Sequence, residues 1–380
     1  MLPFIHTAVQ YKTEPIYRKP NNSKNRIEVI DALRGISLFG IIIAHCVYSF
    51  YKSSPQSYVK ELGYIDNLLL FVVNLFIERK FFTIFSFIFG LIFAIQNEKG
   101  NNKRSFVFKF LWKMLLLLII GVLHNEIYNF DILQIYAFCG LILVLFSECK
   151  TKILPIVSLV FWVLSSIAIF YSEDLIQFFK SIESNGCLIP AKLPFQVFSG
   201  RLPMILSLFI FGYFVGRLKL FNDLVNHEHY FIKAMIISFF IKFCFSLGKE
   251  FELINVTSLA YEATIVPLQN LTLACIYVSL VVVLSNRIKV FKKLTSWLIP
   301  LGKTGLTNYV AQSVYFLFLF EYLFKYLFKL ENLYVPLLIT LFFFFTQVII
   351  SKWWTSCYRL GPVEWLWKSC CEFKFKNNKF

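Results

Sequence analysis

Charged residues are scarce in this 380-residue chain, at 16% of the sequence against the roughly 25% that is typical of soluble domains. Its nine cysteines include no CxxC pair, so neither a zinc site nor a redox pair is indicated. The motifs GxxxxGK[ST], GxSxG and HExxH are also absent. ATP-driven transport, serine hydrolysis and zinc catalysis therefore lack support, and we expect neither a metal site nor a bound cofactor.

The apolar content indicates a membrane protein. Hydrophobic residues make up 58% of the sequence, aromatic residues 19%, and the mean hydropathy is +0.65. A water-soluble fold of this length cannot bury so much apolar side chain. The first 28 residues are polar and basic, without the pattern of a cleavable signal peptide. We predict an all-α fold, a polytopic transmembrane helix bundle, with the lipid bilayer as its partner.

Ten apolar runs are near the roughly 17–25 residues that cross a bilayer as a helix. We predict about ten spans, at residues 29–50, 80–97, 106–124, 131–147, 152–171, 201–218, 231–248, 263–285, 304–324 and 333–352. A shorter run, 66–77, lies just before the charged residues Glu78, Arg79 and Lys80. We expect this run to form an interfacial or re-entrant helix.

The distribution of basic residues predicts the orientation. Of 38 lysines and arginines, 26 fall in the segments that a cytoplasmic N-terminus would put inside, 10 in the outer segments and 2 within spans. Basic residues are enriched on the cytoplasmic side of membrane proteins. This bias predicts that both termini are cytoplasmic. The formal net charge of +16 then reflects orientation, and no nucleic-acid partner is expected.

The first predicted span carries three ionisable residues, which are costly inside a bilayer and usually face a cavity or a partner. Asp31 and Arg34 are three residues apart and share one helix face. His45 follows Arg34 by eleven residues, about three turns and about 16 Å along the axis, so both lie on the same face. These residues also have a purely structural explanation. Asp31 and Arg34 would form a salt bridge at the membrane interface, and His45 would be a polar residue packed between helices.

The connection between the third and fourth predicted spans reads GVLHNEIYNFDILQIY. It places His124, Glu126 and Asp131 together at the predicted outer surface. A histidine oriented by a carboxylate is a common general base, so His124 and Asp131 are candidates for that role. A solvated hairpin in which Asp131 caps the next helix explains the same residues equally well.

Polar residues also recur near the C-terminal end of the chain. Asn308 and Gln312, in the ninth predicted span, stand four residues apart and share a face. Such side chains either bridge helices or line a cavity in a membrane. The segment ending WLWKS is typical of an interfacial anchor, and Glu364 within it is expected to pair with a cytoplasmic arginine or lysine.

Five segments carry a family resemblance. They are DALRGISLFGI at 31–41, KFFTIFSFIFGLIFAIQ at 80–96, GVLHNEIYNFDILQIYAFCGL at 121–141, LGKTGLTNYVAQS at 301–313 and GPVEWLWK at 361–368. In this order they resemble the signatures of the YeiB-like family of bacterial polytopic membrane proteins. That family is similar to transmembrane acyltransferases of the acyltransferase-three and heparan-alpha-glucosaminide N-acetyltransferase types. The resemblance covers about residues 28–370 and implies the bacterial cytoplasmic membrane as the location.

The resemblance also implies a division of the chain. Residues 1–28 would be a basic cytoplasmic tail, and 29–218 an N-terminal transmembrane part with the first six spans. Residues 219–370 would form the YeiB-like C-terminal transmembrane domain with the last four spans, followed by a basic tail at 371–380.

An acyltransferase is the first functional hypothesis that follows. The acyltransferase-three signature is an arginine separated by ten residues from a catalytic histidine, the spacing of Arg34 and His45, although many YeiB-like proteins carry asparagine where His45 stands. Acyl-CoA would be the co-substrate, and a surface sugar, lipid or small molecule the acceptor. His45 would be the general base, with His124 and Asp131 beside the acceptor entrance.

The donor side of this hypothesis uses the remaining polar residues. Arg34, held by Asp31, would contact a CoA phosphate or amide, and Asn308 with Gln312 would donate hydrogen bonds to the developing oxyanion. Two other hypotheses remain open. A transporter of a small solute would use the same residues to line a pathway, although the two halves show no convincing repeat. A structural or immunity-type membrane protein would tolerate substitution of Arg34 and His45.

Overall fold

The computed structural model describes residues 22–54, 62–100, 102–128, 132–174, 177, 199–251, 258–327, 332–372 and 378. Throughout these residues the fold is helical and contains no strand. The helices of the first half are α1 (Asn22–Ser53), α3 (Tyr64–Phe76), α4 (Lys80–Lys99), α5 (Lys103–Ile127), α6 (Leu133–Leu143), the 3-10 turn η1 (Val144–Phe146), α7 (Leu154–Phe170) and α10 (Arg201–Arg217).

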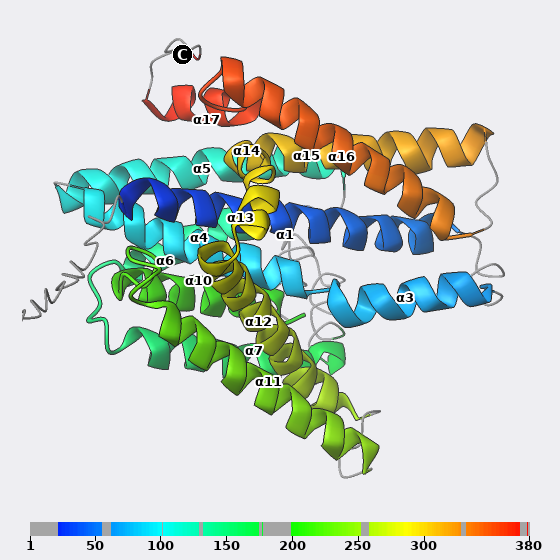
Figure 1. The fold of residues 1–380 in the computed structure, drawn as a ribbon, viewed down its shortest axis with the longest axis horizontal. Helices are drawn as coiled ribbons and strands as arrows, with labels where there is room; N and C mark the ends of the chain where they lie inside the picture. Colours follow the sequence, from blue (N-terminus) through cyan, green and yellow to red (C-terminus); the bar gives the residue numbers. More distant parts are fainter. Residues whose placement is uncertain are drawn as a thin grey trace, which may run out of the picture.

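The second half contains two π-helical segments and seven α-helices. They are α11 (Glu228–Glu250), the π segment η2 (Tyr261–Ile265), α12 (Val266–Arg287), α13 (Lys289–Ser296), α14 (Ile299–Lys303), α15 (Gly305–Phe316), the π segment η3 (Leu317–Leu327), α16 (Tyr334–Cys357) and α17 (Pro362–Glu372). Figure 1 shows α1 crossing the middle of the molecule, with α4 and α10 on one side and α5 and α15 on the other.

The predicted apolar runs all fall on helical segments, so the prediction of an all-α fold is confirmed. Among the described residues, five helices are long and apolar enough to cross a membrane: Glu28–Ser53, Lys103–Glu126, Glu228–Glu250, Tyr261–Arg287 and Tyr334–Cys357. The number of ten spans and the cytoplasmic position of both termini remain predictions. The run at 66–77 corresponds to α3, which is separated from α4 by a break at Arg79, where φ is 65°.

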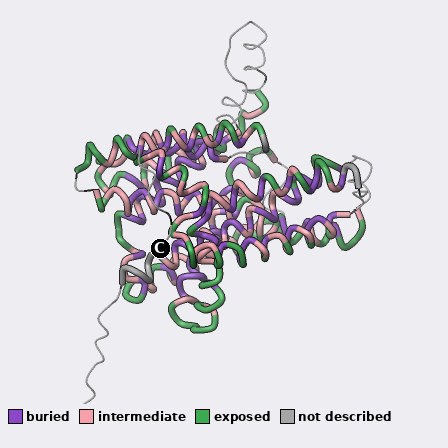
Figure 2. Tube along the Cα trace, turned by 90° about the horizontal axis from the view of Figure 1, so that it is seen from above, coloured by how far each residue is buried: buried purple, intermediate pink, exposed green. Residues whose placement is uncertain are grey.

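The outer faces of several helices are apolar and exposed. On α11 the exposed side chains include Ile236 at 60%, Phe239 at 65% and Phe240 at 64%. α7 and α16 present similar rows, whereas α1 is largely buried. Figure 2 shows buried positions on the inner sides of the helices and exposed positions around them. Such wide exposed apolar surface suits contact with lipid rather than with water.

The contact between α4 and α10 is the most extensive contact between two helices in the described part of the chain. The α-carbon of Gly90 approaches the backbone of α10, and a β-carbon there would overlap the carbonyl oxygen of Phe209. Gly212 of α10 meets the carbonyl of Phe87 in the same way. Small residues allow the backbones of membrane helices to approach this closely.

Replacing Gly90 by alanine should therefore destabilise the fold, because the added methyl group forces α4 and α10 apart. Overpacking of this kind costs about 1–3 kcal/mol. The matched control is Gly63→Ala, since nothing lies within 4 Å of a β-carbon at Gly63. Thermal unfolding of the purified variants in one detergent checks this, and equal melting temperatures for the two variants would refute the packing argument.

Candidate functional site

The first part of the site is the cluster around Arg34, near the start of α1. Its Nη1 lies 3.4 Å from Oδ1 of Asp31, one turn earlier on α1. Helix α14 packs directly on this region, and a β-carbon at its Gly302 would overlap the carbonyl oxygen of Asp31. A β-carbon at Gly305 would lie 3.1 Å from Nη2 of Arg34. The guanidinium therefore lies at the start of α15.

Glu364 holds the same end of α15 from the other side. Its Oε1 accepts hydrogen bonds from the backbone N–H groups of Leu306, at 2.6 Å, and Thr307, at 3.1 Å. Its Oε2 accepts a further bond from the Thr307 hydroxyl. Glu364 was expected to pair with an arginine or lysine. Instead its carboxylate binds the first N–H groups of a helix, where the helix dipole favours negative charge.

The second part of the site surrounds His45, which lies eleven residues after Arg34 on α1. Its ring lies 5.6 Å from that of Tyr128 and 6.2 Å from those of Tyr309 and Phe316, measured between centroids. Its Nδ1 is buried and has no hydrogen-bond partner in the part of the chain that the structure describes. A buried polar atom without a partner is costly, and this nitrogen keeps an unused capacity for one hydrogen bond.

His124 comes from α5 and approaches the same aromatic cluster. Its ring centroid lies 5.4 Å from that of Tyr309, and the residue is only 3% exposed. Tyr309 thus lies between two histidines from different helices, and its hydroxyl accepts a 3.4 Å hydrogen bond from Ile132 N–H. The prediction placed His124 with Asp131, but Asp131 lies outside the described residues.

Tyr128 closes the cluster beyond the end of α5. Its hydroxyl lies 3.1 Å from the Ser49 hydroxyl on α1. Burial raises the pKa of Tyr128, and the hydrogen bond with Ser49 opposes that rise only in part. The phenol is therefore protonated at neutral pH and acts as a neutral hydrogen-bonding group beside His45.

Asn308 and Gln312 share a helix face, as their spacing predicted, and that face meets α16. The Asn308 amide nitrogen donates to the Thr304 hydroxyl at 2.8 Å and to the Ser351 hydroxyl at 3.0 Å. The Gln312 amide nitrogen donates to Oε1 of Gln347 at 3.1 Å. Both side chains therefore join α15 to α16, the interhelical arrangement that polar residues adopt in membranes.

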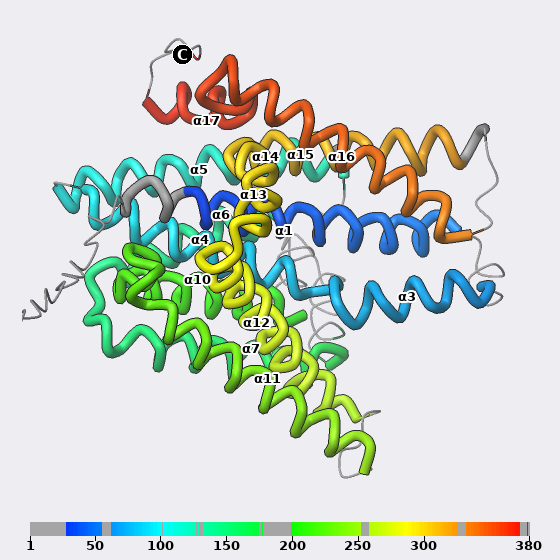
Figure 3. The backbone as a smooth tube through the Cα atoms, viewed as in Figure 1, coloured from blue at the N-terminus to red at the C-terminus, as the bar shows by residue number. Residues whose placement is uncertain are grey.

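The α15 helix connects the two parts of the site. It begins with Gly305 beside Arg34, and its Tyr309 and Phe316 lie beside His45. Arg34 and His45 are eleven residues apart on α1, or about 16 Å, so α15 follows α1 over that distance. Figure 3 shows α1 and α15 running alongside each other. The cavity that the structure shows has other lining residues and includes neither Arg34 nor His45.

Sequence reasoning missed Tyr309, Tyr128 and the capping role of Glu364. The signal for Tyr309 was present, because it stands four residues after Gly305 and seven before Phe316, on one helix face. No comparable signal exists for Glu364, whose partners are 57 and 58 residues away in the sequence.

Substituting Glu364 by glutamine should destabilise the chain, because the start of α15 loses a charged capping group. Loss of a helix cap costs about 0.5–2 kcal/mol. Glu372→Gln is the control, as its carboxylate lies on the same helix at 4.0 Å from Lys368, a surface pair of small value. Thermal unfolding compares the two, and a larger loss for Glu372→Gln would contradict the capping role.

Comparison with known proteins gives two overlapping family matches. Residues 26–249 match the family described as "Heparan-alpha-glucosaminide N-acetyltransferase, catalytic". Residues 215–374 match the family described as "Protein of unknown function (DUF418)". No solved structure matches the chain significantly.

Two curated relatives match nearly the whole chain. The "Uncharacterized protein YxaH" of Bacillus subtilis (strain 168) is 24% identical over 92% of this chain and 95% of its own length. The "Uncharacterized 39.9 kDa protein in amylase 3'region" of Bacillus acidopullulyticus is 25% identical over 90% of this chain and 93% of its own. Because the acetyltransferase match covers more than half of the chain, the chain belongs to that family, and its C-terminal part matches the DUF418 family of the YeiB-like proteins that the sequence resembles.

Proposed function

We propose that the protein transfers an acyl group across the bacterial cytoplasmic membrane. The donor is cytoplasmic acyl-CoA, and the acceptor is a hydroxyl or amine of a saccharide, lipid or small molecule at the outer face. The match of residues 26–249 to an acetyltransferase catalytic family supports this proposal. Transfer across the membrane is needed because the donor and the acceptor lie on opposite sides. CoA is too highly charged to cross the bilayer, and the acceptor lies outside.

The observation that carries the proposal is the meeting of His45 and His124 around Tyr309. The two histidines come from α1 and α5, and both are enclosed by aromatic rings. A general base needs a nitrogen that is free to accept a proton and lies within hydrogen-bond reach of the acceptor. The buried Nδ1 of His45, which has no partner among the described residues, meets the first requirement.

In the proposed reaction, His45 removes the proton of the acceptor hydroxyl or amine as its oxygen or nitrogen attacks the thioester carbonyl carbon. The carbon–sulfur bond of acyl-CoA then breaks, and the CoA thiolate leaves with the electron pair and takes up the proton. His124 positions the acceptor or serves as a second base. The neutral hydroxyls of Tyr128 and Tyr309 supply hydrogen bonds beside these rings.

On the donor side, Arg34 binds a phosphate or amide of CoA, because a guanidinium offers several fixed donors. Asp31 holds the guanidinium, and the start of α15 covers it. Asn308 and Gln312 were predicted to stabilise the oxyanion directly. Since their amide nitrogens donate to α16 and to α15 itself, we assign them the task of holding α15 in place along α1.

The base assignment predicts the effect of His45→Gln on acyl transfer. Loss of a general base lowers the rate by about 10²–10⁴-fold, while the similar size of glutamine preserves packing. His229→Gln is the control, because His229 is an exposed residue at the start of α11. The measurement is CoA release from acetyl-CoA by protein in proteoliposomes, with amino sugars and cytoplasmic-membrane lipids offered as acceptors.

Full activity of His45→Gln would remove the base assignment. Flux of a solute through the proteoliposomes without any CoA release, in the wild type, would contradict acyl transfer and favour a transporter instead.

A further inference from the structure

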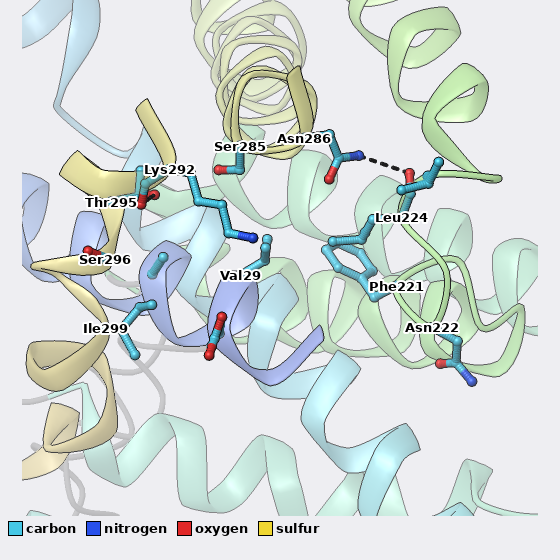
Figure 4. A pocket seen from close by; sticks show the side chains of 13 residues that line it. Val29, Phe221, Asn222, Leu224, Ser285, Asn286, Lys292, Thr295, Ser296 and Ile299 are labelled. Carbon is cyan, nitrogen blue, oxygen red and sulfur yellow. Dashed lines mark hydrogen bonds between the residues drawn. The ribbon is translucent and has the colours of Figure 1, made fainter. Parts of the chain in front are cut away.

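A second, separate site lies at the end of the bundle where α1 begins. The structure has a cavity of about 90 Å³ there, between the first turns of α1, the α10–α11 connection, the end of α12, α13 and the start of α14. Figure 4 shows Lys292 of α13 extending into this ring of side chains, across from Val29 of α1. A water needs roughly 10–15 Å³ of such space, so the cavity has room for a small polar group.

One negative and one positive side chain line this cavity without neutralising each other. Glu28, on the second turn of α1, is half-buried, whereas Lys292 is exposed. In the described part of the chain neither forms an ion pair or a side-chain hydrogen bond. Among the other polar lining groups, the Asn286 amide donates to the Leu224 carbonyl at 3.0 Å, whereas the buried Oδ1 of Asn222 has no hydrogen-bond partner among the described residues.

The remaining lining is largely apolar, with Val29, Phe221, Leu224 and Ile299 among its members. A partly buried carboxylate without a partner carries a desolvation cost, which a cationic ligand group would offset. An ammonium beside Glu28 and a phosphate beside Lys292, joined by methylene groups on the apolar wall, would complement all three features of the cavity.

We propose that this cavity binds a zwitterionic phosphate ester of the phosphoethanolamine type. Lys292 pairs with the phosphate, and Glu28 pairs with the ammonium. The site is distinct from the proposed acyl-transfer site, because neither Arg34 nor His45 lines it. The ligand group is the same in two possible sources, the headgroup of phosphatidylethanolamine and soluble phosphoethanolamine.

The surroundings of α13 place the cavity where a lipid headgroup can reach it. The α13 helix carries Lys289, Lys292 and Lys293, while its Val290 and Leu294 are 69% and 63% exposed. A short helix with exposed apolar residues and lysines is typical of one that lies in the headgroup region of a bilayer. Trp297, at the end of α13, lies under the ammonium of Lys352 at 3.5 Å from the ring centroid, which fits the same region.

The test is calorimetric titration of O-phosphoethanolamine into purified full-length protein in a lipid-free detergent. The variants are Glu28→Gln, Lys292→Gln and the control Lys293→Gln, which removes the same charge from a neighbouring residue outside the cavity lining. We expect saturable binding to the wild type and to Lys293→Gln. Each cavity variant should bind about tenfold more weakly, because it loses one charge-assisted contact.

Probes with only half of the charges test the zwitterionic character. Inorganic phosphate and ethanolamine, titrated separately, should each bind at least tenfold more weakly than O-phosphoethanolamine. A second arm measures retention of phosphatidylethanolamine against phosphatidylglycerol during purification of the same variants. Preferential retention of phosphatidylethanolamine, lost in Glu28→Gln and Lys292→Gln, identifies the lipid as a source, whereas binding in the soluble arm alone identifies the free zwitterion.

Three results would overturn the proposal. They are a loss in Lys293→Gln equal to that in Lys292→Gln, inorganic phosphate binding as tightly as O-phosphoethanolamine, and no binding in either arm. Since Lys292 is exposed on a surface helix, its substitution leaves the fold intact, and a thermal melt of each variant checks this. The binding test does not depend on acyl transfer by the wild type or by His45→Gln. Either proposal can therefore fail without the other.

Discussion

The close contact between α1 and α14, the short helix that leads into α15, is the constraint on which the site depends. A side chain at Gly302 would overlap the backbone of Asp31, and one at Gly35 would press on the Leu298 backbone. Because these positions are glycine, the start of α15 lies on the guanidinium of Arg34. The rest of α15 then follows α1 toward His45, where the Tyr309 ring lies 6.2 Å from the histidine ring between centroids.

This contact is stabilised at the start and along one side of α15 by polar groups that would be costly if left unpaired in a membrane. Glu364 accepts the first N–H groups of the helix, and Asn308 and Gln312 join its side to α16. The C-terminal helix α17 is therefore part of the site's architecture, although its residues lie more than 300 positions from Arg34 in the sequence. Two buried polar atoms of this region, Nδ1 of His45 and Oε1 of Gln312, have no hydrogen-bond partner among the described residues.

Much of the fold was predictable because a chain that enters lipid must satisfy its backbone within helices. Each predicted apolar run falls on a helical segment, and the shared face of Asn308 and Gln312 followed from their spacing. Which face meets which helix was not predictable, since that depends on packing between distant segments. The sequence therefore could not show that Glu364 caps α15, or that His124 approaches His45 through Tyr309.

Equilibrium binding of acetyl-CoA to the purified protein tests the central claim most directly, that α1 and α15 together receive an acyl-CoA donor at Arg34. The comparison is wild type against Arg34→Ala, with Arg104→Ala removing the same charge from an exposed position on α5. Loss of a charge-assisted contact should weaken binding about tenfold or more in Arg34→Ala, with little change in Arg104→Ala. Equal affinity of Arg34→Ala and wild type, or no binding by the wild type, would contradict the account.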